Sequence, residues 1–226
     1  MRMIQSTEFA DQCSLHISKV TGKDKHTFWL VKRSFDILFS AAALVVFSPL
    51  MLCIAIAIIA DDPQGGPIYR QERCGRHGER FMIYKFRSMC VDADKLLGPL
   101  LAKNEMSGPV FKMGNDPRVT RAGRFLRKAS LDELPQFFNV LKGDMSIVGP
   151  RPALPGEVEQ YPERARRRLW ITPGITCIWQ TTTCRNMTSF ADWIEMDLRY
   201  LEGRSMLLDI KIMLRTLWVI LRGFGV

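Results

Sequence analysis

The longest apolar run in the chain reads ILFSAAALVVFSPLMLCIAIAIIA and extends from Ile37 to Ala60. Its 24 residues contain no charged side chain and would form roughly 36 Å of α-helix at 1.5 Å per residue. Because the hydrocarbon core of a bilayer is about 30 Å thick, the run predicts a membrane segment. It begins too late and is too long for the core of a secretory signal.

Ser48 and Pro49 lie in the middle of this segment, and a proline removes a backbone donor and bends a helix. Two topologies are open: a kinked helix that spans the membrane, or a re-entrant helix that enters and leaves through one leaflet. Positively charged flanks tend to stay in the cytoplasm, and here both flanks are basic. The charges therefore favour the re-entrant form. The basic residues before the segment are Arg2, Lys19, Lys23, Lys25, Lys32 and Arg33.

A second apolar pattern, SMLLDIKIMLRTLWVILRGFG, occupies residues 205–225 and is interrupted by charges. It predicts an amphipathic helix that lies in the membrane interface with its basic residues toward headgroups. An ordinary core helix remains the alternative. The charged residues concerned are Asp209, Lys211, Arg215 and Arg222.

Between these two patterns, the residues 68–86 form two short apolar runs around Gly75 and Gly78, which predicts a small β-hairpin. Helical patterns dominate after Val91. We therefore expect an α+β fold that is mostly helical. Its expected parts are a polar N-terminal arm (1–31), a re-entrant membrane helix (32–60) and a cytosolic catalytic domain (61–226) that ends in the interfacial helix.

The charge balance narrows the class of partner. The 226 residues include 32 Lys and Arg against 23 Asp and Glu, a net charge of +9, which indicates nucleic acid, phospholipid headgroups or phosphorylated metabolites. Basic and aromatic residues are not interleaved as in single-strand binders, so nucleic acid is not expected. The six cysteines form no CxxC pair, and the three histidines lie in polar surroundings. Chemistry based on carboxylates and cations is therefore expected.

Four arginines follow one another at three-residue spacing in RVTRAGRFLRK, and on a helix they would form a basic stripe. The stripe either faces solvent and headgroups or binds an anion, and the sequence leaves both interpretations open. The four are Arg118, Arg121, Arg124 and Arg127.

Two adjacent acids, Asp132 and Glu133, follow this stripe. Ser130 and Glu133 match a capping box that would begin a helix at Ser130, although Pro135 leaves the start of that helix open. Asp132 is not required by the box, and a helix N-terminus would stabilise its charged form. Carboxylates surrounded by cations suit phosphoryl transfer, and the nearby cations are Lys85, Arg87, Arg127 and Arg151.

The segments KRSFDILFSAAALVVFSPL, GPIYRQERCG, FMIYKFRSM, DPRVTRAGRFLRKASLDELPQFFNVLKGDMSIVGPRP and DLRYLEGRSMLLDIKIMLRTL follow one another in this order. In this order the chain resembles the bacterial sugar transferases, the monotopic phosphoglycosyl transferases, over about residues 30–223. The long central segment makes the resemblance far more specific than a short motif.

The resemblance implies an enzyme that transfers a sugar-1-phosphate from a UDP-sugar to a membrane polyprenyl phosphate, releases UMP and uses Mg²⁺. It implies that Asp132 is the nucleophile of a covalent phosphosugar intermediate and that Glu133 assists metal binding or proton removal. Mg²⁺ would be held by these two acids. The remaining positions expected at the phosphates or substrate are Lys85, Arg87, Arg127, Arg151, Arg185 and Asp197.

The match has departures. Cys177 stands where members commonly have glycine in PGITG, and Cys184 replaces the glycine of GRN, so the sugar is left undetermined. No multi-span region precedes the match, so the chain is expected to be the catalytic part alone. We expect it at the cytoplasmic face of a bacterial inner membrane, with phospholipid as partner, and the sequence leaves a homodimer open. Direct transfer without a covalent step, and a basic membrane scaffold without catalysis, are the alternatives.

Overall fold

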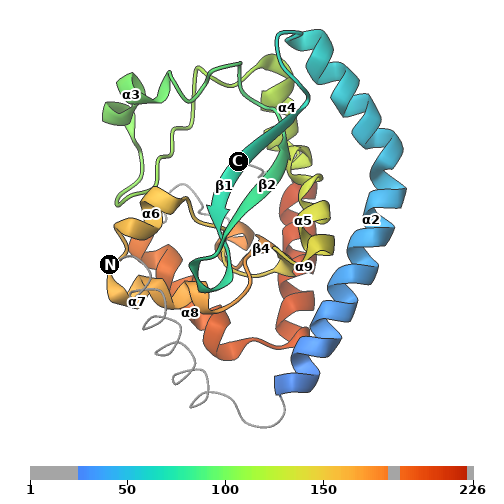
Figure 1. Cartoon of the computed structure of the whole chain (residues 1–226), viewed down its shortest axis with the longest axis vertical. Helices are drawn as coiled ribbons and strands as arrows, with labels where there is room; N and C mark the ends of the chain where they lie inside the picture. The colour runs from blue at the N-terminus through green and yellow to red at the C-terminus, as the bar shows by residue number, and fades with distance from the viewer. Residues whose placement is uncertain (1–24, 183–188, 223–226) are drawn as a thin grey trace.

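The computed structural model describes residues 25–182 and 189–222, in which helices surround two small sheets (Figure 1). The predicted arm therefore lies largely outside the described residues. The longer helices are α2 (Lys25–Asp61), α4 (Arg121–Lys128), α5 (Gln136–Lys142), α8 (Phe190–Gly203) and α9 (Met206–Leu221). The shorter ones are α3 (Leu97–Leu100), α6 (Pro155–Glu159) and α7 (Glu163–Arg166), with 3-10 turns η1 (Arg76–Gly78), η2 (Leu101–Lys103), η3 (Leu131–Glu133), η4 (Arg167–Trp170) and η5 (Trp179–Thr181).

Helix α2 contains the predicted membrane segment and runs along one side of the molecule, where its axis changes direction (Figure 1). It is continuous through Ser48 and Pro49, so the predicted break is a bend within one helix. By length and composition α2 is able to cross a membrane, and only 17% of its most apolar stretch is buried in the protein. An exposed apolar helix of this length indicates membrane association.

The two halves of α2 pack on the rest of the protein, whereas its middle does not. In the first half the buried residues are polar or small: Lys32, Asp36, Ser40 and Ala43. In the second half Ile54 and Ile58 are buried. No residue between Ala43 and Ile54 is buried. The first turns of the predicted membrane helix therefore belong to the protein core, and the stretch around Pro49 stands away from it.

The predicted hairpin is present. Strands β1 (Ile68–Cys74) and β2 (Arg80–Phe86) pair antiparallel, with Ile68 opposite Phe86. Gly78 at the turn has a φ of +78°, which glycine adopts without steric cost. Asn139 connects α5 to the hairpin. Its Oδ1 accepts from the backbone N–H of Tyr84 at 3.0 Å, and its Nδ2 donates to the carbonyl of Met82 at 2.7 Å.

A second sheet, which the helical pattern after Val91 did not predict, pairs β3 (Ser146–Val148) with β4 (Gly174–Thr176) in parallel. It lies in the main core, and Val148 is 1% exposed. A Cβ on Gly174 would lie 2.1 Å from the backbone nitrogen of Gly149. Only glycine allows the two strands to approach in this way.

Helix α9 has one face in the core and one face open. Its Asp209 is buried, where it pairs with Lys32 of α2 at 2.6 Å and accepts from the Tyr200 hydroxyl at 2.8 Å. Asp209 is therefore a core residue of α9. Ile212 and Val219 are buried beside it, so α9 is in part a core helix. The opposite face is apolar and exposed at Leu207, Ile210, Leu214, Leu217, Trp218 and Leu221.

Candidate functional site

The adjacent acids Asp132 and Glu133 lie in the 3-10 turn η3, between α4 and α5. Ser130 has a φ of +55° and its side chain caps nothing, so the predicted capping box is wrong. Helix α5 begins at Gln136, directly after Pro135, which resolves the start that the sequence left open. A proline is compatible with this position because the first turn of a helix has no acceptor for its N–H.

The residues on either side of the acids pack on the membrane helix. Leu131 and Leu134 contact an apolar cluster that includes Ile54 and Ile58 of α2 and Phe86 of β2. The chain between these two leucines holds Asp132 and Glu133. The acids are therefore fixed beside the second half of α2, close to where that helix leaves its exposed middle stretch.

Glu133 is paired with Lys85 at the end of β2. Lys85 Nζ lies 2.7 Å from Glu133 Oε1, and each side chain is about one quarter exposed, at 28% and 24%. The pair joins residues 48 positions apart. The ion pair with Lys85 holds Glu133 in place and partly neutralises its charge. Of the two acids, Asp132 is the one without a fixed side-chain partner among the described residues.

Asp132 is 9% exposed. Among the described residues, no other residue donates a hydrogen bond to its carboxylate. Burial raises the pKa of Asp132, and Lys85 and Arg127 act in the opposite direction by attracting the charged form. The expectation of a helix N-terminus that stabilises the carboxylate is therefore wrong, since burial dominates.

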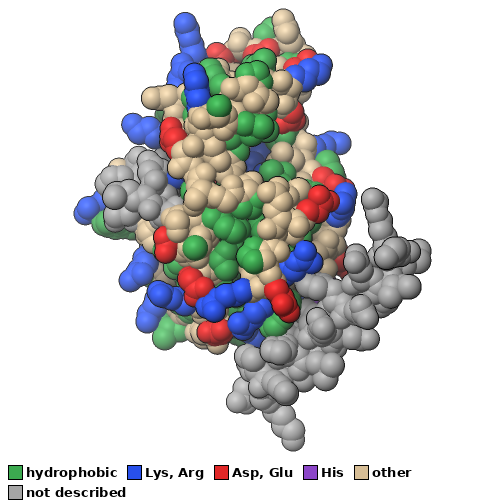
Figure 2. Space-filling model, turned by 90° about the vertical axis from the view of Figure 1, so that its left-hand side faces the viewer, with side chains coloured by type: hydrophobic (Ala, Val, Ile, Leu, Met, Phe, Trp, Pro, Cys, Tyr) green, Lys and Arg blue, Asp and Glu red, His purple; other side chains and the backbone are tan. Residues whose placement is uncertain are grey.

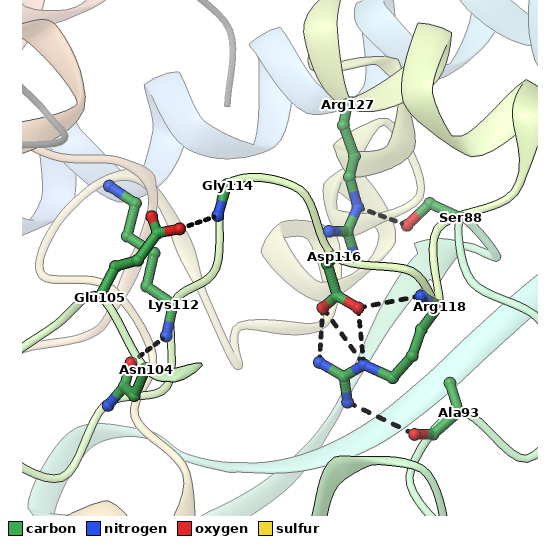
Figure 3. Close-up of polar contacts among 9 residues, drawn as sticks. All are labelled: Ser88, Ala93, Asn104, Glu105, Lys112, Gly114, Asp116, Arg118 and Arg127. Carbon is green, nitrogen blue, oxygen red and sulfur yellow. Dashed lines mark hydrogen bonds and ion pairs between the residues drawn. The ribbon is translucent and has the colours of Figure 1, made fainter. Parts of the chain in front are cut away.

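Arg127, on the last turn of α4, is the second cation beside Asp132. Its Nε donates to the Ser88 hydroxyl at 2.9 Å (Figure 3). Burial lowers the pKa of Arg127, whereas Asp132 raises it. Within the described part of the chain, no hydrogen bond uses its terminal nitrogens Nη1 and Nη2. The guanidinium is thus fixed by one edge and open at the other.

The predicted arginine stripe does not form. Arg118 precedes α4 and is buried, with Nη2 at 2.6 Å and Nε at 2.9 Å from the two oxygens of Asp116 (Figure 3). Arg127 also turns inward, whereas Arg121 and Arg124 are exposed. Of the four arginines, Arg118 is therefore paired inside the fold and Arg127 lies beside Asp132. The other two lie on the outer surface.

Arg87 has a structural role. Its guanidinium donates to the Asp62 carboxylate at 2.6 Å and to the carbonyl of Gly65 at 2.9 Å, and it is 8% exposed. These contacts tether the end of β2 to the chain that follows α2. The sequence predicted that Arg87 binds a phosphate. In the structure its guanidinium is instead bonded to Asp62 and Gly65.

Arg151 and Asp197 meet in a second cluster, away from the charges that act on Asp132. Asp197 is 1% exposed and forms an ion pair with Arg168 at 2.6 Å. Arg168 also donates to the Arg151 carbonyl at 3.0 Å and to the Tyr161 hydroxyl at 2.7 Å. Asp197 is therefore too deeply buried to touch a substrate in this structure and supports the Arg151 segment through Arg168.

The Arg151 side chain is itself half-buried. Its guanidinium lies 5.7 Å from the ring centroid of Trp193 and 3.8 Å from Glu157. Neither contact uses up its donors, so Arg151 is available to an anion. Arg185, the remaining predicted site residue, lies outside the described residues.

Sequence reasoning missed Ser88, Arg168 and Asn139. Ser88 is one residue beyond the cation run YKFR, and no spacing rule marks its hydroxyl. Asn139 interrupts the apolar segment QFFNVL, and this interruption could have predicted a buried side chain that forms hydrogen bonds. Arg168 lies within the run RARRRLW, whose spacing does not distinguish the buried member from its exposed neighbours.

The face seen in Figure 2 is hollowed near its centre, with Lys or Arg atoms at the base of the hollow. Uncharged and apolar atoms form most of its rim in this view. A recess of this kind, basic at its base, suits a phosphate-bearing ligand with a less polar body.

The residues present are compatible with Mg²⁺. No group of three or more His, Cys, Asp or Glu side chains gathers as a cation site within residues 25–182 and 189–222. Asp132 and Glu133 supply two adjacent carboxylates, and Mg²⁺ is commonly held by one or two carboxylates together with substrate phosphates. The donor set therefore fits an ion that binds with a nucleotide.

The sequence model described as "Bacterial sugar transferase" matches residues 27–223. The galactosyl transferase CpsE of Streptococcus agalactiae serotype III is 45% identical over 202 residues, which are 89% of this chain and 44% of the relative. The undecaprenyl-phosphate galactose phosphotransferase of Salmonella typhimurium is 43% identical over 206 residues, 89% of this chain and 42% of the relative. The exopolysaccharide production protein ExoY of Rhizobium meliloti is 38% identical over 205 residues, 89% and 90% respectively. The chain thus spans less than half of the first two relatives.

Proposed function

The chain belongs to the bacterial sugar transferase family, and from this premise we propose that it transfers a sugar-1-phosphate from a UDP-sugar to a membrane polyprenyl phosphate with release of UMP. The names of the relatives describe a galactosyl transferase and an undecaprenyl-phosphate galactose phosphotransferase. The reaction would begin the membrane stage of polysaccharide or glycoconjugate assembly. Its site would lie at the cytoplasmic face of a bacterial inner membrane.

One observation supports this proposal above the others. Asp132 has no fixed partner among the described residues, lies near two cations and sits between leucines that pack on the membrane helix. A soluble nucleotide-sugar and a lipid phosphate are able to meet only at the membrane surface. The carboxylate that would act on both lies beside the second half of α2, which follows the exposed apolar stretch of that helix.

We infer that Asp132 acts as a nucleophile. One of its oxygens would attack the sugar-bearing phosphorus of the UDP-sugar, and the bond from that phosphorus to the bridging oxygen would break, so that UMP leaves with this oxygen. An oxygen of the polyprenyl phosphate would then attack the same phosphorus and release the Asp132 carboxylate. Arg127 and Lys85 would stabilise negative charge on the phosphates in both displacements.

We propose that Asp132 and Glu133 hold Mg²⁺ together with the nucleotide phosphates. When bound, the ion would neutralise phosphate charge. The role left to this chain is to orient the two carboxylates, which the Lys85 ion pair does for Glu133 and the turn η3 does for Asp132.

The packing of α2 supports a re-entrant arrangement. Its first half contacts the core through Lys32 and Asp36, and its second half contacts the same domain through Ile54 and Ile58. A helix that spans a bilayer would leave a cytosolic domain at one end only. With both halves on one domain and the middle exposed, the stretch around Pro49 would be the deepest point in the lipid.

The test is to incubate the membrane-bound full chain with UDP-sugars that carry label in the sugar-bearing phosphate, without lipid acceptor. We expect one molecule of UMP per enzyme and label attached to Asp132, and we expect neither with Asp132→Asn. Stoichiometric UMP release only when acceptor is present, with no label on the protein, would support direct transfer instead. No UMP from any donor of a UDP-sugar panel, with or without acceptor, would support the non-catalytic scaffold.

A further inference from the structure

Ser88 makes the side-chain contact that orients Arg127. Its hydroxyl accepts from Arg127 Nε at 2.9 Å, and the residue is only 8% exposed (Figure 3). A guanidinium held through Nε keeps its plane fixed while Nη1 and Nη2 remain free to form a fork around a phosphate. Geometry of this kind is useful only if the anchor itself does not move.

The backbone of Ser88 is locked to α4. Its carbonyl accepts from the Thr120 N–H at 3.1 Å, where α4 begins. A Cβ on Gly123 would lie only 2.0 Å from the same carbonyl oxygen, so the helix and the Ser88 segment are in direct backbone contact. Ser88 and Arg127 therefore move as one unit, although they are 39 positions apart.

Asp116, which lies below Arg127 in Figure 3, forms no hydrogen bond with Nη1 or Nη2 of Arg127 within the described residues. Both Asp116 oxygens accept from the Arg118 guanidinium, at distances between 2.6 and 3.2 Å. The Asp116–Arg118 pair is buried, with side-chain exposures of 5% and 6%. Arg127 is thus left with Ser88 as its fixed hydrogen-bond partner within the described ranges, and Asp132 and Asp116 are the negative charges that act on it.

We propose that Ser88 is a positioning residue for the transfer reaction: its hydroxyl fixes the Arg127 guanidinium so that the two terminal nitrogens face the phosphate that reacts at Asp132. The inference rests on the function proposed above and adds a residue to it. Without the hydroxyl, Arg127 retains its charge but loses the orientation of its fork.

The experiment compares Ser88→Ala, Arg127→Ala and the double variant of the full chain, with UMP release from the best UDP-sugar of the panel as readout. A displaced guanidinium should lower kcat/KM of Ser88→Ala by about 10- to 100-fold, mainly in kcat. In the Arg127→Ala background the same substitution should cost less than about twofold, because its effect acts through Arg127.

Ser146→Ala is the matched control. Ser146 is 2% exposed and its hydroxyl has no partner among the described residues, so its loss should leave kcat/KM within about twofold. Equal losses for Ser88→Ala with and without Arg127 would overturn the inference, as would an unchanged rate. If Ser88→Ala does not fold, Ser88→Cys keeps the volume with a weak acceptor and gives the same two readings. An inactive wild type would refute the proposed function and with it the inference, whereas an active wild type with an inert Ser88→Ala would refute the inference alone.

Discussion

The Ser48 hydroxyl donates to the carbonyl oxygen of Val45 at a distance of 2.8 Å. In a regular helix that carbonyl would accept from the N–H of the residue four positions later, which here is Pro49 and has none. The side chain of Ser48 thus satisfies the acceptor that Pro49 leaves free. The bend in α2 therefore does not leave this carbonyl unpaired in the most exposed and apolar part of the helix.

Ser48→Ala should destabilise the protein by about 1–3 kcal/mol in a bilayer or micelle, because the Val45 carbonyl would lose its donor in an apolar environment. Unfolding in a membrane mimetic at increasing denaturant measures the change. Ser40→Ala is the control: Ser40 is fully buried on the same helix, but its hydroxyl has no partner among the described residues. Equal effects of the two substitutions would contradict the role of Ser48.

Asp132→Asn should abolish transfer and stabilise the fold at neutral pH. Burial raises the pKa of Asp132, so the folded state binds its proton more tightly than the unfolded state, where the value is about 3.8. The stability of the wild type therefore falls as pH rises through this interval, and the asparagine variant avoids that loss. Denaturant unfolding from neutral to acid pH should show the advantage of the variant disappear below the unfolded value.

Asp192→Asn gives the opposite sign and serves as a control. Hydrogen bonds from Ser189 lower the pKa of Asp192 at the start of α8. Its contribution to stability is present at neutral pH and is lost as pH falls through the lowered value. The asparagine variant should thus be less stable than the wild type at neutral pH, with the difference shrinking in acid. A stabilised Asp192→Asn would show that the two carboxylates are not distinguished by burial.

Gly123→Ala should disrupt the site as a whole. The added Cβ would lie 2.0 Å from the Ser88 carbonyl, a backbone atom that is unable to turn aside. We expect a loss of more than about 2 kcal/mol in stability and no activity. Gly156→Ala, within α6, meets nothing within 4 Å and should be neutral or stabilising by about 0.5–1 kcal/mol. Thermal unfolding of both variants separates the steric clash at Gly123 from the general effect of replacing a helical glycine by alanine.

Asp197→Asn should cost about 3–5 kcal/mol, because it leaves Arg168 charged and unpaired in the core. Arg164→Gln, which breaks an exposed pair with Glu195, should cost at most about 1 kcal/mol. Denaturant midpoints at one pH give both values. Comparable costs for the two substitutions would mean that the buried Arg168–Asp197 pair contributes no more to stability than an exposed ion pair.

The outer face of α4 should bind anionic lipid. Arg121 and Arg124 are exposed there beside Phe125, which is 66% exposed. At about 1 kcal/mol per cation, replacing both arginines by glutamine should weaken binding to vesicles that contain an anionic phospholipid by roughly 30-fold. Binding to neutral vesicles should not change. The same double change at Arg164 and Arg166 of α7 should have little effect, and an equal effect would indicate a response to net charge alone.

The sequence alone determined the features that depend on neighbours along the chain. The uncharged run from Ile37 to Ala60 required an apolar environment, because a helix of that length has too little polar surface for water. The two short apolar runs around Gly75 and Gly78 indicated the hairpin, since strand-length runs joined by turn glycines pair locally. The adjacency of Asp132 and Glu133 likewise needed no fold.

Only the tertiary structure decided which charges meet and which are buried. Lys85 and Arg87 are two positions apart, yet one pairs with Glu133 and the other with Asp62. Burial raises the pKa of Asp132, and the leucines on both sides of it pack on α2; local spacing carries no information about either. The physical reason is that propensity and periodicity act over a few residues, whereas desolvation and ion pairing depend on surfaces brought together from distant parts of the chain.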